Sequence, residues 1–338
     1  MKPGSDGPKA LTFSLLRLLA DGEFHSGEAM ARQLGVSRAS VNGALGEAEN
    51  FGLTLYRVRG RGYRLLDPPH WLDAASIARH LGKHHGDFHI TILDSAPSTN
   101  TLLLRHLSEG APSGSVLAAE WQGKGRGRMG RAWHSSLGNA LTFSLLWRFD
   151  CGLGALSGLS LAVGVALIRA LRTLGISGAR LKWPNDVLNG SGAKLAGVLV
   201  EAQGDMLGPS AVVIGVGLNL TLPQTVLQQI DRPAAGLADS CSALPDRNHL
   251  LAAILLELGN VLREFGAHGF NAVHAEWESY HALQNRAVRL ALPDGSHLAG
   301  VARGVSDEGA LLLETNAEVK IIHAGEISLT AETQHATA

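Results

Sequence analysis

Glycine and arginine alternate within residues 123–131 of the 338-residue chain, in the order Gly-Lys-Gly-Arg-Gly-Arg-Met-Gly-Arg. Glycines let a backbone approach a ligand closely, and guanidinium groups bind phosphate or carboxylate through paired hydrogen bonds. The stretch follows a predicted strand that ends near Glu120, which indicates a cationic loop at a sheet edge. It matches the dinucleotide pattern G-x-G-x-x-G only formally, because no helix follows it. A ligand loop and a non-specific nucleic-acid contact both remain open at this point.

Three further segments carry residues that could take part in chemistry. Residues 182–186, Lys-Trp-Pro-Asn-Asp, place two polar side chains in a proline turn at the end of a strand. Lys194 begins an otherwise apolar strand, where its charge needs a partner. Gly215 and Gly217 alternate inside another strand, so one face of that strand lacks side chains. Each segment also has an ordinary explanation: a turn without chemistry, a lysine that protects a sheet edge, or close packing of a helix.

Composition and charge are those of an ordinary folded protein. With 17% charged residues and a net charge of −1, the chain is not a uniformly basic nucleic-acid coat. Cys151 and Cys241 are too few for a disulfide framework, so reduced thiols in a cytoplasmic protein are expected. The histidines between residues 80 and 89 have mixed spacing, so no protein metal site is expected. The uncharged stretch 151–168 is rich in glycine and short for a membrane span, which favours a buried helix and no membrane association.

The elements around these segments predict an α+β protein of several parts. Residues 1–66 contain three short helices (11–19, 26–34 and 38–51) and a β-ribbon at 55–65, which is the pattern of a winged helix-turn-helix. A linker with a short helix is expected at 67–87. The hairpin turns of residues 285–332 are typical of a small SH3-like β-barrel, and 333–338 form a tail.

Residues 88–284 alternate strands with helices, which predicts a central domain of mixed α/β type. Its clear helices are 153–174 and 248–265. Its strand candidates are residues 89–93, 115–119, 140–147, 179–182, 196–201 and 211–220.

Taken together, the Gly-Arg loop, the Lys-Trp-Pro-Asn-Asp turn, residues 194–201 and residues 214–219 resemble the biotin protein ligases. The resemblance extends end to end, and it is closest to the bifunctional subgroup that joins biotin ligase to biotin operon repressor. It implies that the central domain is catalytic. The enzyme would form biotinyl-5'-AMP from biotin and ATP with Mg²⁺. It would then transfer biotin to a lysine of a biotin carboxyl carrier protein, usually that of acetyl-CoA carboxylase.

The same resemblance implies roles for individual residues. Cations must offset the repulsion between a carboxylate and a polyphosphate, and a carboxylate can orient the acceptor lysine or take its proton. The expected catalytic residues are Arg126, Arg128, Lys194, Asp186 and Lys182. The residues expected to bind biotin are Ser98, Thr99, Asn100, Gln122, Arg126, Gly127, Arg128, Lys194, Gly215 and Gly217. Those expected to bind the adenylate are Trp133, Asn185 and Asn219, and Mg²⁺ would arrive with ATP.

One position departs from the family pattern. Relatives often carry an acidic residue directly before the Ser-Thr-Asn element, whereas this chain has Pro97 there. The serine and threonine are present, so the biotin contacts are expected to be kept. The geometry of the loop around Ser98 is left open.

The N-terminal unit predicts a second function. A winged helix-turn-helix places its recognition helix in the major groove and its wing on the DNA backbone. The residues predicted to contact operator DNA are Ser37, Arg38, Ser40 and Asn42 on the helix and Arg57, Arg59, Arg61 and Arg64 on the wing. The resemblance also implies a homodimer that forms when adenylate is bound. Because the helix carries two glycines and two acidic residues, a degenerate module that no longer binds DNA is the alternative.

Two other functional classes stay open. One is a ligand-sensing transcriptional regulator without ligase activity, against which the intact Arg126, Arg128, Asp186 and Lys194 argue. The other is an acyltransferase of similar fold, such as a lipoate ligase. The pairing of the Gly-Arg loop with Lys-Trp-Pro-Asn-Asp favours biotin over lipoate.

Overall fold

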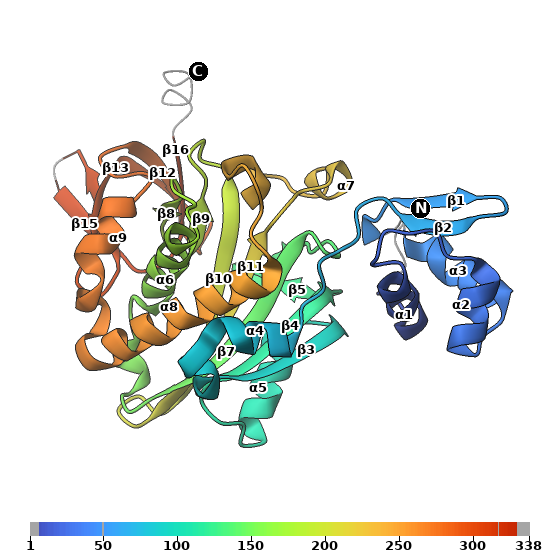
Figure 1. Ribbon diagram of the computed structural model, residues 1–338. Helices are drawn as coiled ribbons and strands as arrows, with labels where there is room; N and C mark the ends of the chain where they lie inside the picture. Colours follow the sequence, from blue (N-terminus) through green and yellow to red (C-terminus); the bar gives the residue numbers. More distant parts are fainter. Residues whose placement is uncertain (1–6, 49–50, 317, 330–338) are drawn as a thin grey trace.

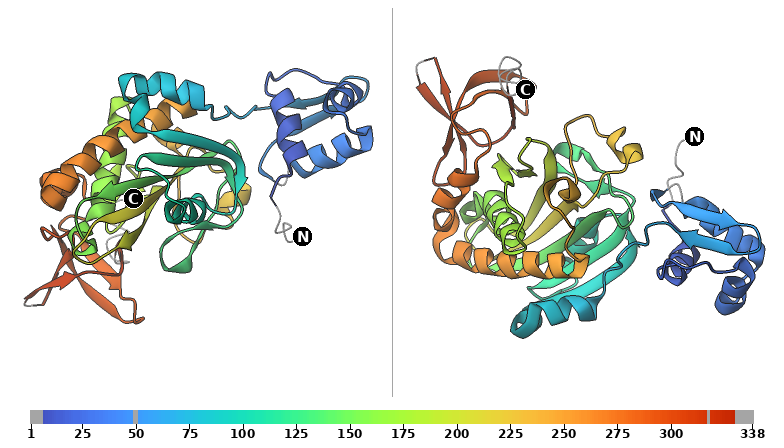
Figure 2. Two further views of the ribbon diagram at one scale, coloured as in Figure 1. Left: turned by 90° about the horizontal axis from the view of Figure 1, so that it is seen from below. Right: turned by 45° about the horizontal axis from the view of Figure 1, so that its top comes forward.

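The computed structural model describes residues 7–48, 51–316 and 318–329. It contains a small N-terminal unit, a central domain built on a seven-stranded sheet, and a C-terminal five-stranded sheet. Figure 1 shows the N-terminal unit in blue at one end of the molecule and the C-terminal sheet in red at the other, and both views of Figure 2 agree. The predicted α+β architecture is confirmed, whereas the boundaries between its parts stay predictions.

The N-terminal unit has the predicted order of three helices and a hairpin. Its elements are α1 (Ala10–Leu18), α2 (Gly27–Leu34), α3 (Arg38–Ala48), β1 (Leu55–Val58) and β2 (Gly62–Leu65). Ser26 and Ser37 begin α2 and α3 as caps, because each side chain accepts a hydrogen bond of 3.0 Å from the backbone three residues later. The predicted end of α3 at residue 51 falls partly outside the described residues, since 49 and 50 are not among them.

The central sheet has the strand order β3-β4-β7-β11-β10-β9-β8. β3 and β4 are parallel and every other pair is antiparallel. The strands are β3 (His89–Ala96), β4 (Ser115–Gln122), β7 (Ala140–Phe149), β8 (Arg180–Lys182), β9 (Asp186–Leu188), β10 (Lys194–Gly204) and β11 (Ser210–Asn219). All six predicted strands are present. The three-residue β9 was not predicted, because it is too short to show an alternating pattern.

Helices cover both faces of this sheet. On one face α6 (Leu159–Thr173) and α8 (Arg247–His268) share a continuous core with the strands, joined by α4 (Ala74–Leu81). On the other face α5 (Thr99–Ser108) packs on β4, β7 and β11. The sequence did not predict α5, although Ser98 caps it. Figure 1 shows α5 on the side of the sheet opposite α6 and α8.

The predicted helix over residues 153–174 was wrong at its start. Residues Leu153–Leu156 form a short 3-10 turn, and α6 begins only at Leu159. Gly158 breaks the helix with φ of 79°, and a Cβ there would lie 2.7 Å from Phe270 Cβ. Close packing therefore overrides the helical pattern. Within the described residues no helix combines the length and apolar character needed to cross a membrane.

The C-terminal unit is an antiparallel sheet in the order β15-β14-β13-β12-β16, with the predicted hairpin turns between its first four strands. Its strands are β12 (Ala287–Ala291), β13 (His297–Val305), β14 (Leu311–Thr315), β15 (Glu318–Ile322) and β16 (Glu326–Leu329), and α9 (His274–Tyr280) precedes it. The indole N–H of Trp183 donates to the carbonyl of Gly309 at 3.0 Å, which joins this sheet to the central domain.

Short elements complete the described chain. They are β5 (Gly125–Arg126), β6 (Ala132–Trp133) and α7 (Gln224–Leu227), with 3-10 turns at Gly82–Asp87, Arg128–Gly130, Leu237–Ser240 and Gly269–Ala272.

The segment before α4 is fixed to the central domain by a buried ion pair. Arg247 Nη1 lies 2.7 Å from Glu120 Oε2, and the two side chains are 4% and 0% exposed. Arg247 also donates to the carbonyls of His70 and Ala140, and Glu120 accepts from the backbone N–H of Leu72. The linker is therefore held firmly at this point, together with the end of β4.

We predict that Arg247→Met lowers the free energy of unfolding by about 3–5 kcal/mol, because it leaves the carboxylate of Glu120 buried and unpaired. Urea denaturation followed by circular dichroism measures the loss. Arg263→Met is the control, because Arg263 is half exposed and its ion pair with Asp87 is long, at 3.9 Å. This substitution is expected to change the free energy of unfolding by no more than about 0.5 kcal/mol. Equal effects of the two substitutions would contradict the prediction.

Candidate active site

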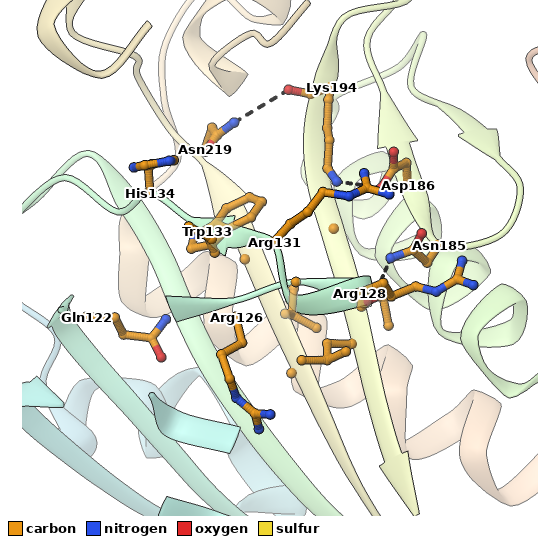
Figure 3. A pocket seen from close by; sticks show the side chains of 18 of the residues that line it. Gln122, Arg126, Arg128, Arg131, Trp133, His134, Asn185, Asp186, Lys194 and Asn219 are labelled. Atoms are coloured by element: carbon orange, nitrogen blue, oxygen red, sulfur yellow. Dashed lines mark hydrogen bonds and ion pairs between the residues drawn. The ribbon is translucent and has the colours of Figure 1, made fainter. Parts of the chain in front are cut away.

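A cavity of about 380 Å³ lies on the face of the sheet that α5 covers. Under α5 this face is apolar, with Leu146 of β7 and Val213 of β11 against the leucines of the helix. Further along the same two strands the side chains are small or absent. Ser144 of β7 is paired with Gly215 of β11, and Gly217 follows on β11. These residues leave a hollow that the Gly-Arg loop lines from the other side, as Figure 3 shows.

Gly215 and Gly217 make room for protein side chains as well as for a ligand. A Cβ on Gly215 would lie 2.1 Å from Asn100 Oδ1, and a Cβ on Gly217 would lie 2.3 Å from Trp133 Cε2. Both separations are far below van der Waals contact. Asn100 and Trp133 therefore lie directly on β11, and both also line the cavity.

Lys194 reaches the cavity through a β-bulge. The pairing of β10 with β9 shifts register between Lys194 and Ala196, and a bulge of this kind re-aims a side chain. Nζ of Lys194 accordingly lies over Gly197, 3.0 Å from where a Cβ on that residue would be. It forms an ion pair of 2.6 Å with Asp186 Oδ1 and lies 5.9 Å from the ring of Trp133 (Figure 3). Asp186 is thus the partner that the lysine's charge requires.

Two arginines of the loop are held by carboxylates from distant parts of the chain. Arg126 Nη2 lies 3.0 and 2.7 Å from the two carboxylate oxygens of Glu201 on β10. Arg131 forms an ion pair with Glu326 of the C-terminal sheet, which Arg232 also contacts at 3.2 Å. Although burial by itself raises it, the pKa of Glu326 is kept below its ordinary value by these two arginines. The C-terminal unit thereby contributes to one wall of the cavity.

Two of the donor groups at the cavity, from two different residues, make no hydrogen bond with any described residue. One is the guanidinium of Arg128, whose pKa is lowered by burial and which is half-buried beside Asn185 in Figure 3. The other is the buried indole N–H of Trp133. A desolvated cation without a hydrogen-bonded anion is costly. The arrangement therefore favours an anionic ligand at Arg128 and a hydrogen-bond acceptor near Trp133.

Of the Lys-Trp-Pro-Asn-Asp turn, only the last two residues, Asn185 and Asp186, line the cavity. Trp183 is buried under the C-terminal sheet, and Asn185 Nδ2 donates to the carbonyl of Val198 at 2.7 Å. Lys182 does not line the cavity. Burial lowers the pKa of its ammonium group, although nearby carboxylates partly oppose this effect. It lies close enough to interact electrostatically with Asp186 and Glu326.

The opposite end of the cavity is built from amide and hydroxyl groups. Gln122 Oε1 accepts from the backbone N–H of Thr99 at 2.7 Å and lies 3.2 Å from its hydroxyl. Ser98 caps α5. The carbonyl of Pro97 accepts from the backbone N–H of Lys124 at 2.8 Å. Pro97, where the family often has an acid, therefore joins this end of the cavity to the Gly-Arg loop.

All residues predicted to bind biotin or the adenylate lie around this one cavity, and of the predicted catalytic residues only Lys182 does not. Their roles toward a ligand stay predictions. Polar lining residues that the sequence did not predict are Arg131, His134, Gln229, Asp231, Arg232 and Glu326. Arg131 belongs to the Gly-Arg stretch and could have been included. Most of the others lie in segments without a motif, and only the folding of the chain brings them here.

The wing of the N-terminal unit presents its arginines in different ways. Arg61 and Arg64 lie over the ring of Phe24, at 4.2 and 5.8 Å from its centre. Arg57 donates to the carbonyl of Leu45 at 3.4 Å. Arg59 is exposed and makes no hydrogen bond or ion pair with the described residues. It is thus the wing arginine most available to a phosphate.

Some side chains of α3, the helix predicted to contact DNA bases, already form hydrogen bonds within the protein. Ser37 caps α3, and Asn42 accepts from the hydroxyl of Tyr63 on the wing at 3.1 Å. One of the two acidic residues of this segment, Glu47, forms an ion pair of 3.2 Å with Lys9. The negative charge of that carboxylate is therefore partly offset.

Comparisons with known proteins agree with this geometry. Residues 92–219 match the Biotin/lipoate A/B protein ligase family, residues 284–330 the Biotin protein ligase C terminal domain, and residues 12–64 an HTH domain. The bifunctional ligase/repressor BirA of Escherichia coli is 38% identical over 315 residues, which covers 93% of this chain and 96% of that protein. This chain belongs to the biotin protein ligase family.

Further relatives of this biotin protein ligase support the assignment. The bifunctional ligase/repressor BirA of Bacillus subtilis is 33% identical over 92% of this chain and 95% of its own length. A solved structure, the biotin protein ligase from Aquifex aeolicus in complex with biotin and ATP, matches with a TM-score of 0.58 and 28% identity, over 70% of this chain and 97% of that one. The predicted membership of the bifunctional subgroup and the predicted class of enzyme are confirmed.

We predict that Lys182→Met makes this ligase more stable at pH 7, because burial disfavours the charged ammonium in the folded state. Since the pKa of Lys182 is lowered on folding, the cost is present below the folded pKa and disappears as the pH rises toward the unfolded value. The advantage of the variant should therefore shrink as the pH rises toward about 10, the ordinary range of a lysine. Urea denaturation at several pH values measures it, with the exposed Lys83→Met as control. A constant or growing difference would refute this account.

Proposed function

We propose that the cavity carries both steps of biotin transfer to a carrier protein. The single observation that carries the proposal is the half-buried guanidinium of Arg128, which has no hydrogen-bond partner within the described residues and lies beside the Lys194–Asp186 pair. A cavity of about 380 Å³ lies in the size range of small-molecule sites. Its amide-lined end suits the ureido group of biotin, and its cationic end suits a carboxylate next to a phosphate.

In the first step a carboxylate oxygen of biotin attacks the α-phosphorus of ATP, and the bond to pyrophosphate breaks. Arg126, Arg128 and Lys194 are proposed to offset the repulsion between the two anions and to stabilise the charge on the leaving group. Trp133 offers a ring and an unpartnered N–H to the adenosine. Gln122 and the hydroxyl groups of the first turn of α5 are proposed to hold the other end of biotin.

In the second step the amine of the acceptor lysine attacks the carbonyl carbon of the adenylate, and the bond to AMP breaks. Asp186, only 8% exposed, is proposed to orient this amine and to take its proton. Its ion pair with Lys194 keeps a carboxylate at the place where the anhydride forms. The acceptor that we propose is a biotin carboxyl carrier protein, that of acetyl-CoA carboxylase.

Magnesium enters this proposal as the ion that accompanies ATP. Mg²⁺ sites commonly combine one or two carboxylates with substrate phosphates. We propose that the phosphates of ATP supply most of its coordination. Asp231, 88% exposed at the cavity wall and 3.4 Å from Arg232, is the carboxylate that we propose joins them.

We further propose that the N-terminal unit binds operator DNA and that a homodimer does so when adenylate is bound. The helix-turn-helix match, the exposed Arg59 and the Lys9–Glu47 pair support DNA binding over a degenerate module. Two-fold operators require a two-fold protein.

Lys194→Ala is expected to reduce biotin transfer roughly 100- to 1000-fold, the usual cost of removing one preorganised donor from a charged transition state. Intact-mass spectrometry of an apo carrier domain, incubated with ATP, Mg²⁺ and biotin, measures the transfer. The exposed Lys83→Ala should behave as the parent. Biotin binding without transfer by the parent would favour the ligand-sensing regulator, and transfer of lipoate in place of biotin would favour the related acyltransferase.

Arg59→Ala is expected to weaken binding to duplexes of any sequence and to reduce the slope of log K against log salt concentration by about 1. Fluorescence anisotropy over a range of salt concentrations measures both effects, in the presence of biotin and ATP. Arg105→Ala, a surface change on α5, is the control. Absence of binding by the parent would support the degenerate module, whereas unchanged affinity and slope would show that Arg59 makes no phosphate contact.

A further inference from the structure

The carboxylate of Glu201 has no part in the proposed chemistry, yet it sits at the centre of a polar network under the cavity. Its side chain is 27% exposed, and it meets the loop from the sheet side. Arg126 Nη2 contacts both of its oxygens, at 2.7 and 3.0 Å. Asn100 Nδ2 donates to the same carboxylate at 2.9 Å.

Asn100 anchors this carboxylate to the rigid part of the domain. Its side chain is 4% exposed, and Gly215 is required to admit it. Nδ2 also donates to the carbonyl of Leu199, and Oδ1 accepts from the hydroxyl of Ser144 at 2.5 Å. Both N–H groups of Nδ2 are therefore used by the protein. Asn100 thus holds Glu201 in place.

Arg126 is held by one end only. Its Nη2 makes both contacts with Glu201, whereas Nε and Nη1 make no hydrogen bond with any described residue. In Figure 3 this guanidinium points away from Arg128 and Lys194. A guanidinium has five N–H donors in a fixed plane. Glu201 therefore fixes the orientation of that plane and leaves the remaining donors for a ligand.

We propose that Glu201 is a positioning residue, which orders Arg126 of the Gly-Arg loop for its contact with biotin. The inference rests on the proposed function. The loop is rich in glycine, so an arginine in it loses much conformational freedom when it binds an anion. The ion pair with Glu201 on β10, which Asn100 holds in place, restricts Arg126 before the ligand binds. Less conformational entropy is then lost on binding. Glu201 thus acts through Arg126 and touches no reacting atom.

The test compares Glu201→Gln with the parent in the first step alone, as biotin-dependent release of pyrophosphate from ATP without a carrier. The substituted amide keeps an oxygen for Asn100 but loses the charge that holds Arg126. We expect kcat/KM for biotin to fall about tenfold, and expect the loss to vanish when Arg126→Ala is already present, because the two residues act as one unit. Glu314→Gln, which removes the exposed ion pair to Arg303, is the matched control and should behave as the parent.

Each outcome has a separate meaning. If the parent releases no pyrophosphate, the proposed function fails. If the parent is active and Glu201→Gln equals it, Glu201 positions nothing. An equal loss with and without Arg126 shows a general structural effect and overturns the inference as well. Thermal unfolding of the full chain, unchanged within a few degrees, separates a positioning effect from misfolding.

Discussion

The cavity depends on keeping several cations close together before any anion is bound. Like charges in a half-buried site repel each other and lose solvation. The fold balances most of them with nearby carboxylates: Glu201 pairs with Arg126, Asp186 pairs with Lys194, and Glu326 is shared by Arg131 and Arg232. Arg128 is the cation left without a hydrogen-bonded partner among the described residues. Most of the positive charge at the cavity is thus neutralised, and Arg128 remains available to bind an anion.

These carboxylates come from different layers of the molecule. Glu201 and Asp186 are on the central sheet, and Glu326 is on the C-terminal sheet. The two sheets are joined by the hydrogen bond between Trp183 and Gly309, directly under the turn that carries Asp186. Movement of the C-terminal sheet would therefore change the charge balance of the cavity. The C-terminal unit is therefore coupled electrostatically to the cavity through Glu326.

The hollow itself follows from a change of side-chain size along β7 and β11. Leu146 and Val213 pack under α5, whereas Ser144, Gly215 and Gly217 do not fill the space beyond it. Asn100 and Trp133 enter that space and leave the remainder open. One face of the sheet thus packs against α5 and also forms the floor of the cavity.

The sequence by itself determined the features that depend on neighbours in the chain. Capping serines, alternating apolar residues and turn glycines act over a few residues, so the N-terminal unit and the six predicted strands could be predicted from local patterns. The family resemblance named about half of the residues that line the cavity. The tertiary structure decided the break at Gly158, the place of Lys182 outside the cavity lining, and the partner of each paired cation. A bulge turned Lys194 toward Asp186, and packing brought Glu326 to Arg131 across almost 200 residues. The strength of an ion pair depends on the distance between the two charges in space, and that distance is set by how the chain packs.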